Sequence, residues 1–169
     1  HDNVLAKQSG CGRTPWHFDD HHFPLDTNDV VTAWAPAQPT PIEMGPLSFA
    51  YPLDVHELIK DVTFEKTGTG YDREVSNIFS KNNVSVNATP FELGEVSFHH
   101  NLNFHTASSN RTNCSRIALA NTYYRDGARV INSPTMVSGD WQKFMPNVKP
   151  GDIAASPLNP ICWPVKSEI

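Results

Sequence analysis

Short runs that alternate apolar and polar residues dominate the chain and predict β-strands. The clearest run is residues 30–36, Val-Val-Thr-Ala-Trp-Ala-Pro, which is rich in β-branched and aromatic side chains. Residues 3–7 and 47–51 show the same character over a shorter length. Further strand-like runs lie at residues 84–86, 95–99, 103–105 and 116–124.

Two segments have helical spacing instead. Within residues 52–62, apolar side chains recur at positions i, i+3, i+4 and i+7, and Pro52 suits the first turn of a helix. Residues 71–79 repeat this spacing, and the pair Asn82 and Asn83 is expected to end the segment. Both apolar stripes predict helices that pack one face against the core.

The connections between these runs are rich in turn formers. Residues 36–46 contain four prolines and a glycine, which predicts a rigid connector. Many short strands with Gly/Pro turns indicate a sandwich or a barrel, and a jelly roll is a natural form of either. Because no repeat or linker divides the sequence, residues 1–169 are expected to form a single, mainly β domain.

Composition narrows the classes of partner. A net charge of −5 gives no basic patch for a nucleic acid or an anionic membrane, and no apolar run is long enough to span a bilayer. Three sparse, irregularly spaced cysteines (Cys11, Cys114 and Cys162) predict reduced thiols and a cytoplasmic location. The first residue is His rather than Met, and we expect that an N-terminal portion is missing.

Candidate metal ligands begin with His17 and Asp19, which are separated by one residue. On an extended strand, residues two apart point to the same face, so an imidazole nitrogen and a carboxylate oxygen can reach one metal ion. His105, far downstream, completes a set of two histidines and one carboxylate, which is the facial triad of non-heme Fe(II) oxygenases. Strand alternation places His99 on the same face as His105, so His99 stays open as the distal ligand.

Arg116 lies eleven residues after His105, beyond a polar turn at residues 108–113. A hairpin of this length is expected to return Arg116 beside His105. A guanidinium group there would bind a carboxylate through two hydrogen bonds. A 2-oxo acid that chelates the metal at one end would then be held by Arg116 at the other. Two roles are open for Lys7: a charge at the rim of the pocket or, more simply, a solvated residue at the end of its strand.

Two other functions fit the same ligands. One is a non-catalytic, cupin-like module that binds a metal ion or a small ligand. The other is a zinc hydrolase, since two histidines and a carboxylate also suit zinc, although the sequence places no evident general base for that reaction. Arg116 discriminates between these functions and an oxygenase, because only the oxygenase needs a cation for a co-substrate carboxylate.

Several motifs occur together in a fixed order and, taken as a set, resemble the phytanoyl-CoA dioxygenase family of Fe(II)/2-oxoglutarate-dependent oxygenases. They are His17-Phe18-Asp19, residues 31–34, residues 43–47, residues 94–105, Asn110 with Thr112, and Arg116. The likeness extends from about residue 3 to residue 124, and the tail at residues 151–160 also resembles bacterial and environmental members.

This resemblance implies a double-stranded β-helix, a cupin-like jelly roll with a few short flanking helices. It implies that His17, Asp19 and His105 bind iron and that Arg116 binds the far carboxylate of 2-oxoglutarate. Trp34 and Asn3 match positions that line the co-substrate site. Close to the expected mouth of the pocket, the candidates for contact with substrate are Trp16, His21, His22 and Phe23, although the aromatic ones equally suit a core.

The implied activity uses Fe(II), 2-oxoglutarate and O2 to hydroxylate a C–H bond of a small organic substrate, with decarboxylation of 2-oxoglutarate to succinate. Asp19 favours hydroxylation, because halogenating relatives lack the carboxylate ligand. The chain also departs from the family pattern. Ala107 stands where many members have a serine that contacts the co-substrate, and residues 51–55 replace a familiar Pro-Gly-Ser-His segment. Thr106 and Ser108 are alternative sources of the missing hydroxyl.

Overall fold

The computed structural model describes residues 2–65, 69–132 and 141–163. Eight strands form in the described chain, and most of them follow the predicted runs. They are β1 (Asp2–Lys7), β2 (Thr14–His17), β3 (Val30–Pro36), β4 (Leu47–Tyr51), β5 (Ser85–Ala88), β6 (Ser97–His100), β7 (His105–Ala107) and β8 (Arg116–Tyr124).

The strands make two four-stranded sheets in which every pairing is antiparallel. One sheet has the order β1-β8-β3-β6 and the other the order β2-β7-β4-β5. Apart from β4 and β5, strands that are consecutive in sequence lie in different sheets, as in a jelly roll. The mainly β fold predicted from the sequence is confirmed.

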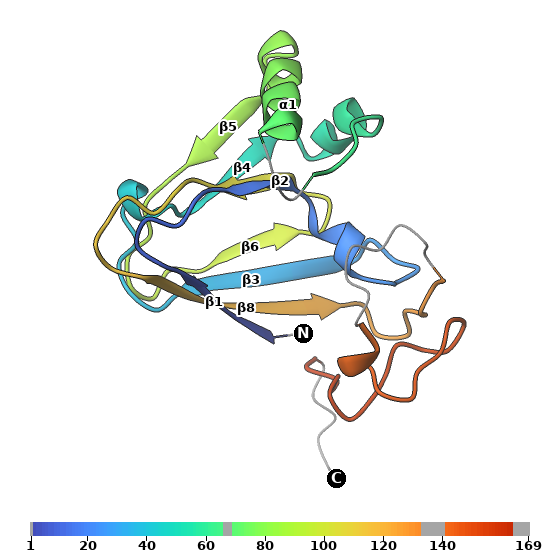
Figure 1. Cartoon of the computed structure of the whole chain (residues 1–169). Coiled ribbons are helices and arrows are strands. Elements are labelled where there is room, and N and C mark those ends of the chain that lie inside the picture. Colours follow the sequence, from blue (N-terminus) through green and yellow to red (C-terminus); the bar gives the residue numbers. More distant parts are fainter. Residues whose placement is uncertain (1, 66–68, 133–140, 164–169) are drawn as a thin grey trace.

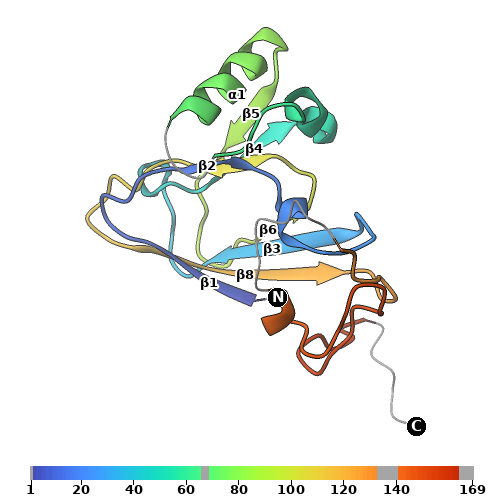
Figure 2. The same cartoon turned by 45° about the vertical axis from the view of Figure 1, so that its right-hand side comes forward.

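Figure 1 shows the two sheets as facing layers, with α1 (Gly70–Lys81) above the sheet that contains β2, β4 and β5. The turned view in Figure 2 shows the same layers. The alternation of β3 explains why it faces the inside of the molecule: its side chains are buried at every second position from Val30 to Pro36. Trp34, at the centre of this strand, is 1% exposed and packs with Leu47 and Phe91 between the layers.

The helical predictions are confirmed at one segment and modified at the other. Residues 70–81 form the α-helix α1, and Val75 and Phe79 on its apolar stripe are buried against Trp16 of β2 and Phe104, the residue before β7. Residues 53–59 form a 3-10 helix, η3 (Leu53–Ile59), rather than an α-helix. Spacing alone cannot separate these two forms, because both bring residues i and i+3 to one side.

Loops close both ends of the sheets. The connection between β7 and β8 runs from one sheet to the other, so the hairpin predicted between His105 and Arg116 is wrong. Asn110 in this connection is 1% exposed, and its side-chain amide donates to the carbonyl oxygens of Lys7 (3.0 Å) and Cys114 (2.8 Å). The backbone of Asn110 also exchanges hydrogen bonds with Gly10 and Cys11, so the connection is held against the loop after β1.

Two smaller observations bear on the sequence predictions. Cys11, Cys114 and Cys162 are free thiols on the exposed surface. Within the described ranges, every helix is too short or too polar to cross a bilayer.

Candidate metal centre

His17, the first candidate ligand, is the last residue of β2. Its Nδ1 lies 2.9 Å from the carbonyl oxygen of Pro15, and a carbonyl can only accept a hydrogen bond. The proton is therefore on Nδ1, and Nε2 keeps its lone pair for a metal ion. Pro15 holds the extended backbone that makes this contact possible.

Asp19 does not share a strand with His17, contrary to the sequence prediction. Phe18 keeps an extended backbone, but Asp19 begins a 3-10 helix, η1 (Asp19–His22). The change of direction is fixed by Asn101, whose carbonyl oxygen accepts hydrogen bonds from the backbone N–H groups of Asp19 (2.8 Å) and Asp20 (3.2 Å). The turn still brings the carboxylate of Asp19 towards His17.

His105 is the first residue of β7 and lies directly across from His17 in the pairing of β2 with β7. Its ring centroid is 4.2 Å from that of His17, and the side chain is buried. Its Nδ1 lies 2.9 Å from the carbonyl oxygen of Asn103, so Nε2 again carries the free lone pair. Both histidines are thus oriented by the carbonyl group two residues earlier.

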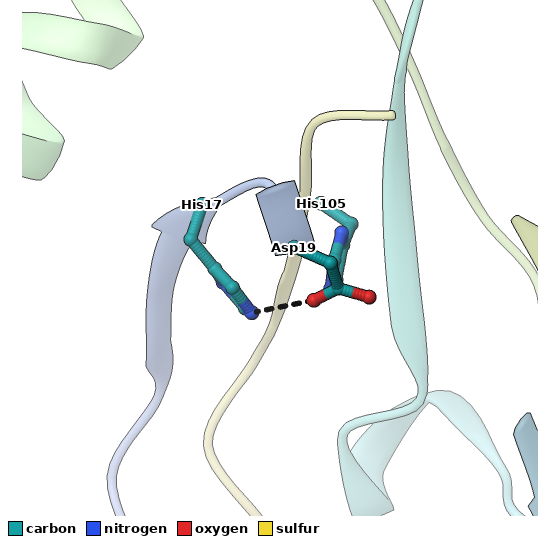
Figure 3. A group of neighbouring side chains, drawn as sticks. All are labelled: His17, Asp19 and His105. Atoms are coloured by element: carbon teal, nitrogen blue, oxygen red, sulfur yellow. Dashed lines mark ion pairs between the residues drawn. The ribbon is translucent and has the colours of Figure 1, made fainter. Parts of the chain in front are cut away.

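The three side chains converge on one point (Figure 3). The Oδ1 atom of Asp19 is 4.0 Å from Nε2 of His17 and 3.7 Å from Nε2 of His105. One ligand atom from each residue lies within 4.8 Å of the other two. Neighbouring ligand atoms on one first-row metal ion are about 3 Å apart, so small side-chain movements would close the group on an ion. Two imidazoles and a carboxylate suit Fe(II) with open positions.

The charges of the group favour metal binding. Burial lowers the pKa of His105 to about 3, and the neighbouring His17 acts in the same direction. Burial by itself would raise the pKa of Asp19, but a hydrogen bond from His99 and the nearby rings of His105 and His17 hold that pKa below its usual range. At neutral pH His105 is therefore neutral and Asp19 is a carboxylate, the forms that bind a cation.

Arg116, the first residue of β8, reaches the same interior from the other sheet. It is 5% exposed, and its guanidinium carbon lies 5.2 Å from the ring centroid of Trp34. One of its terminal nitrogens donates to the carbonyl oxygen of Gly45. Its buried Nε has no hydrogen-bond partner, and none of the ion pairs among the described residues includes Arg116.

Lys7 is a second buried cation next to Arg116, so of its two predicted roles the solvated one is wrong. It pairs with Arg116 across β1 and β8 and is 6% exposed. Its Nζ donates to the carbonyl oxygens of Gly12 and Ser108, each at 2.8 Å, because the loop after β1 folds over the strand end. Burial, together with the smaller effect of the charge of Arg116, lowers the pKa of Lys7 to about 8.

A cavity of about 650 Å³ joins the metal group to the two cations. Of the residues expected near the co-substrate and substrate, Asn3, Trp34, His22 and Phe23 line this cavity. Trp16 instead lies in the core between β2 and α1, where its ring stacks on Phe104 at 5.6 Å. His21 packs on Phe18 with ring centroids 4.1 Å apart. Trp16 and His21 are therefore not part of the cavity wall.

The departure at Ala107 leaves no replacement hydroxyl on its own strand. Thr106 donates to the carbonyl oxygen of Thr14, and neither Thr106 nor Ser108 belongs to the cavity wall. The polar group beside Ala107 is instead the ammonium group of Lys7. Lys7 lines the cavity together with Ala107, and its Nζ is 3.4 Å from the carbonyl oxygen of Ala107.

Two further residues contact Asp19: His99, which the sequence left open as the distal ligand, and Thr32, which had no role assigned from the sequence. His99 lies with its Nε2 3.4 Å from Oδ2 of Asp19, outside the group of three ligand atoms, so the structure groups His105 rather than His99 with His17 and Asp19. Thr32 donates from Oγ1 to the same oxygen at 3.0 Å. The pairing of Thr32 with His99 across β3 and β6 brings them together, and no local sequence signal could have revealed it.

Comparisons with known proteins agree with this fold. Among solved structures, the non-heme alpha ketoglutarate dependent carbocyclase SnoK from nogalamycin biosynthesis is similar with a TM-score of 0.70 and 24% identity, over 93% of this chain and 59% of that chain. The epimerase SnoN, solved in complex with Fe3+, alpha ketoglutarate and nogalamycin RO, gives a TM-score of 0.69 and 20% identity, over 93% of this chain and 61% of that chain. AviO1 from Streptomyces viridochromogenes Tue57 gives a TM-score of 0.53 and 15% identity, over 79% of this chain and 52% of that chain.

The chain thus spans about 60% of the length of SnoK and SnoN. No curated protein matches it in sequence. The sequence model of one family, phytanoyl-CoA dioxygenase (PhyH), matches residues 1–118, which is more than half of the 169 residues. This chain belongs to the phytanoyl-CoA dioxygenase family.

Proposed function

We propose that this chain is the double-stranded β-helix domain of an Fe(II)/2-oxoglutarate-dependent dioxygenase. In this proposal it hydroxylates a C–H bond of a small organic substrate while 2-oxoglutarate is decarboxylated to succinate. The observation that carries the proposal is the placement of two complementary groups around one cavity. His17, Asp19 and His105 each bring one ligand atom to within 4.8 Å of the other two, and Arg116 lies beside the same cavity on the facing sheet.

A 2-oxo dicarboxylate needs both groups. Its 2-oxo acid end chelates a metal ion, and its far carboxylate needs a cation. Arg116 is suited to this role because it is buried with an unpartnered Nε, and no carboxylate neutralises it within the described chain. A buried guanidinium group without an anion is costly, and a bound carboxylate removes that cost.

Each residue of the site has a distinct role in this proposal. His17, Asp19 and His105 hold the metal through three positions on one side and leave the others open. Arg116 binds the far carboxylate of the co-substrate, and Trp34 packs on the guanidinium group so that water is excluded from the ion pair. When bound, Fe(II) with 2-oxoglutarate and O2 supplies the oxidising chemistry.

The substrate is expected on the side of the cavity lined by His22 and Phe23. A cavity of about 650 Å³ is within the range that binds small organic molecules. Hydroxylation is favoured over halogenation because Asp19 occupies the position that a halide would otherwise take.

An anaerobic titration tests the proposal. The metal-free protein is titrated with Fe(II) and then with 2-oxoglutarate while the visible absorbance is recorded. A 2-oxo acid that chelates Fe(II) gives a metal-to-ligand charge-transfer band that neither component gives alone. We expect this band in the wild-type protein and its loss in His105→Ala, which removes a metal ligand.

Arg116→Ala separates co-substrate binding from metal binding. Its affinity for Fe(II) is expected to stay near the wild-type value, while its affinity for 2-oxoglutarate falls by about 100-fold, the loss of a charge-assisted bidentate contact. Binding of Fe(II) without a band in the wild-type protein would instead indicate a non-catalytic metal-binding module. Equal 2-oxoglutarate affinity in the wild type and Arg116→Ala would reject the role of Arg116.

A further inference from the structure

The two oxygens of the Asp19 carboxylate have different neighbours. Oδ1 is approached by Nε2 of His17 and of His105. Oδ2 faces away from that pair and is approached by Nε2 of His99 at 3.4 Å and by Oγ1 of Thr32 at 3.0 Å. Oδ1 thus faces the two histidines of the metal group, and Oδ2 faces His99 and Thr32.

His99 is held rigidly in this position. It lies in β6, is 5% exposed, and pairs with Thr32 of the adjacent β3. Its ring centroid is 5.3 Å from that of Phe49 and 4.8 Å from that of His105. A ring enclosed by two other rings and a strand has little freedom to turn.

The polar contacts of the ring indicate which nitrogen is protonated. The Nδ1 atom of His99 is buried and has no hydrogen-bond partner within residues 2–65, 69–132 and 141–163. Nε2 has the Asp19 oxygen beside it, and a carboxylate oxygen can only accept. A neutral His99 therefore carries its proton on Nε2 and directs it at Oδ2.

We infer that His99 is a positioning residue which, together with Thr32, holds Oδ2 of Asp19 away from the metal ion, so that the carboxylate binds through Oδ1 alone. This inference rests on the metal centre of the proposed function. A carboxylate that bound through both oxygens would fill a further position on the ion. Holding one oxygen keeps that position open, and outer contacts of this kind orient ligands and tune metal affinity.

His99 is not itself a ligand in this arrangement. Its nitrogen lies beside the far oxygen, and it does not belong to the group whose atoms lie within 4.8 Å of one another. Three protein ligands with a restrained carboxylate leave more open positions than four ligands would.

The test uses Co(II) as the probe, because its visible absorption reports both affinity and coordination. His99→Phe removes the N–H donor and keeps an aromatic ring between Phe49 and His105. His99→Gln keeps an N–H at about the position of Nε2. We expect His99→Phe to bind Co(II) about 10- to 100-fold more weakly, with a changed visible spectrum. His99→Gln should stay within about threefold of the wild type and keep its spectrum.

His100→Phe is the matched control. His100 is the next residue of β6 and is half-buried, and its Nδ1 accepts a hydrogen bond from the backbone N–H of Leu102 rather than contacting Asp19. This variant should bind Co(II) as the wild type does. Chemical unfolding of the metal-free proteins checks that His99→Phe is folded; if it is not, His99→Asn replaces it, because its amide is too short to reach Oδ2.

The outcomes separate this inference from the metal centre itself. A wild-type protein that does not bind Co(II) would reject both. If the wild type binds and His99→Phe binds equally with the same spectrum, the metal centre stands and the role of His99 is rejected. Equal losses in His99→Gln and His99→Phe would also reject it, because the N–H donor would then be irrelevant.

Discussion

Lys7 and Arg116 occupy paired positions on neighbouring strands, and both are buried beside the same cavity. Within the described chain neither forms an ion pair with a carboxylate. Lys7 is surrounded instead by carbonyl oxygens, which accept its N–H groups without cancelling its charge. Two buried positive charges at one wall favour a dianionic ligand and repel cations from that end of the cavity.

In the proposed function, the lowered pKa of Lys7 should make binding of 2-oxoglutarate depend on pH. Its pKa of about 8 means that Lys7 is charged at pH 7 and mostly neutral at pH 9. An anion bound nearby is attracted only by the charged form, so affinity for 2-oxoglutarate should fall as pH rises through 8. We expect the dissociation constant for 2-oxoglutarate to be several-fold larger at pH 9 than at pH 7, as measured from the charge-transfer band of the Fe(II) protein.

Lys7→Met is the control for this effect, because it keeps the length of the side chain and removes the titrating group. Its 2-oxoglutarate affinity should be lower at pH 7 and should change little between pH 7 and pH 9. A slope in Lys7→Met as steep as that of the wild type would assign the pH dependence to another group.

Individual site residues differed in how far the sequence could identify them. Donor type and spacing were enough to nominate His17, Asp19, His105 and Arg116 as candidates. The burial of Lys7 and the contact of His99 with Asp19 could not be foreseen, because both depend on which distant strands become neighbours.

At the level of elements, the connection after β7 and the turn at Gly45 support each other. Gly45 follows the 3-10 helix η2 (Ile42–Met44) with a φ of +73°, and its carbonyl oxygen accepts a hydrogen bond from Arg116. A Cβ atom at this position would overlap the backbone carbonyl oxygen of Ser108. Glycine is thus needed both for the left-handed backbone and for the close approach of two segments.

Gly45→Ala should therefore destabilise the protein and disturb Arg116. Chemical unfolding is expected to show a loss of about 3 kcal/mol or more, the cost of a left-handed alanine plus a backbone displacement. The affinity for 2-oxoglutarate should fall as well, because the acceptor that positions Arg116 moves.

Gly10→Ala is a matched control, because Gly10 has the same φ of +73° but no atom within 4 Å of an added Cβ. Gly10→Ala should lower the free energy of unfolding only by the cost of a left-handed alanine, about 1 to 2 kcal/mol. If the two variants lost the same stability, the contact between Gly45 and Ser108 would have no energetic weight.

Element boundaries show where local pattern is sufficient and where it is not. β3 was predicted with its observed bounds, because its alternation reflects burial on one face. The separation of Asp19 from the strand of His17 was not predicted, because it is imposed by the carbonyl oxygen of Asn101, more than eighty residues away in sequence.

At the scale of the whole molecule, each sheet contributes one half of the site. His17 and His105 come from the sheet with the order β2-β7-β4-β5, whereas Arg116 and Trp34 come from the facing sheet. The order of eight strands cannot be worked out from periodicity. The family resemblance predicted the double-stranded β-helix, but the division of the site between the two sheets was not predicted. A ligand that contacts both halves links the two layers.

Thermal unfolding should report this link. Mn(II) replaces Fe(II) in a test performed in air, and we expect 2-oxoglutarate to raise the Tm further only when Mn(II) is present. At a concentration about 100-fold above its Kd, each ligand adds about 2.7 kcal/mol to the free energy of unfolding. This corresponds to a rise in Tm of about 5 to 10 °C for a chain of this size.

A 2-oxo monocarboxylic acid such as 2-oxobutyrate provides the control ligand. It can chelate the metal ion but has no far carboxylate for Arg116, so its increment in Tm should be much smaller. Equal increments from the two acids would mean that the contact across the layers does not contribute.

Both histidines of the metal group are turned by a carbonyl oxygen only two residues earlier, in Pro15 and in Asn103. Each ring is therefore aimed by its own stretch of backbone as soon as that stretch is extended, and His105 has already lost its proton at neutral pH. No slow rearrangement of these rings has to precede the arrival of an ion. The speed with which the site fills should then be governed by diffusion and by how quickly the incoming ion sheds its water.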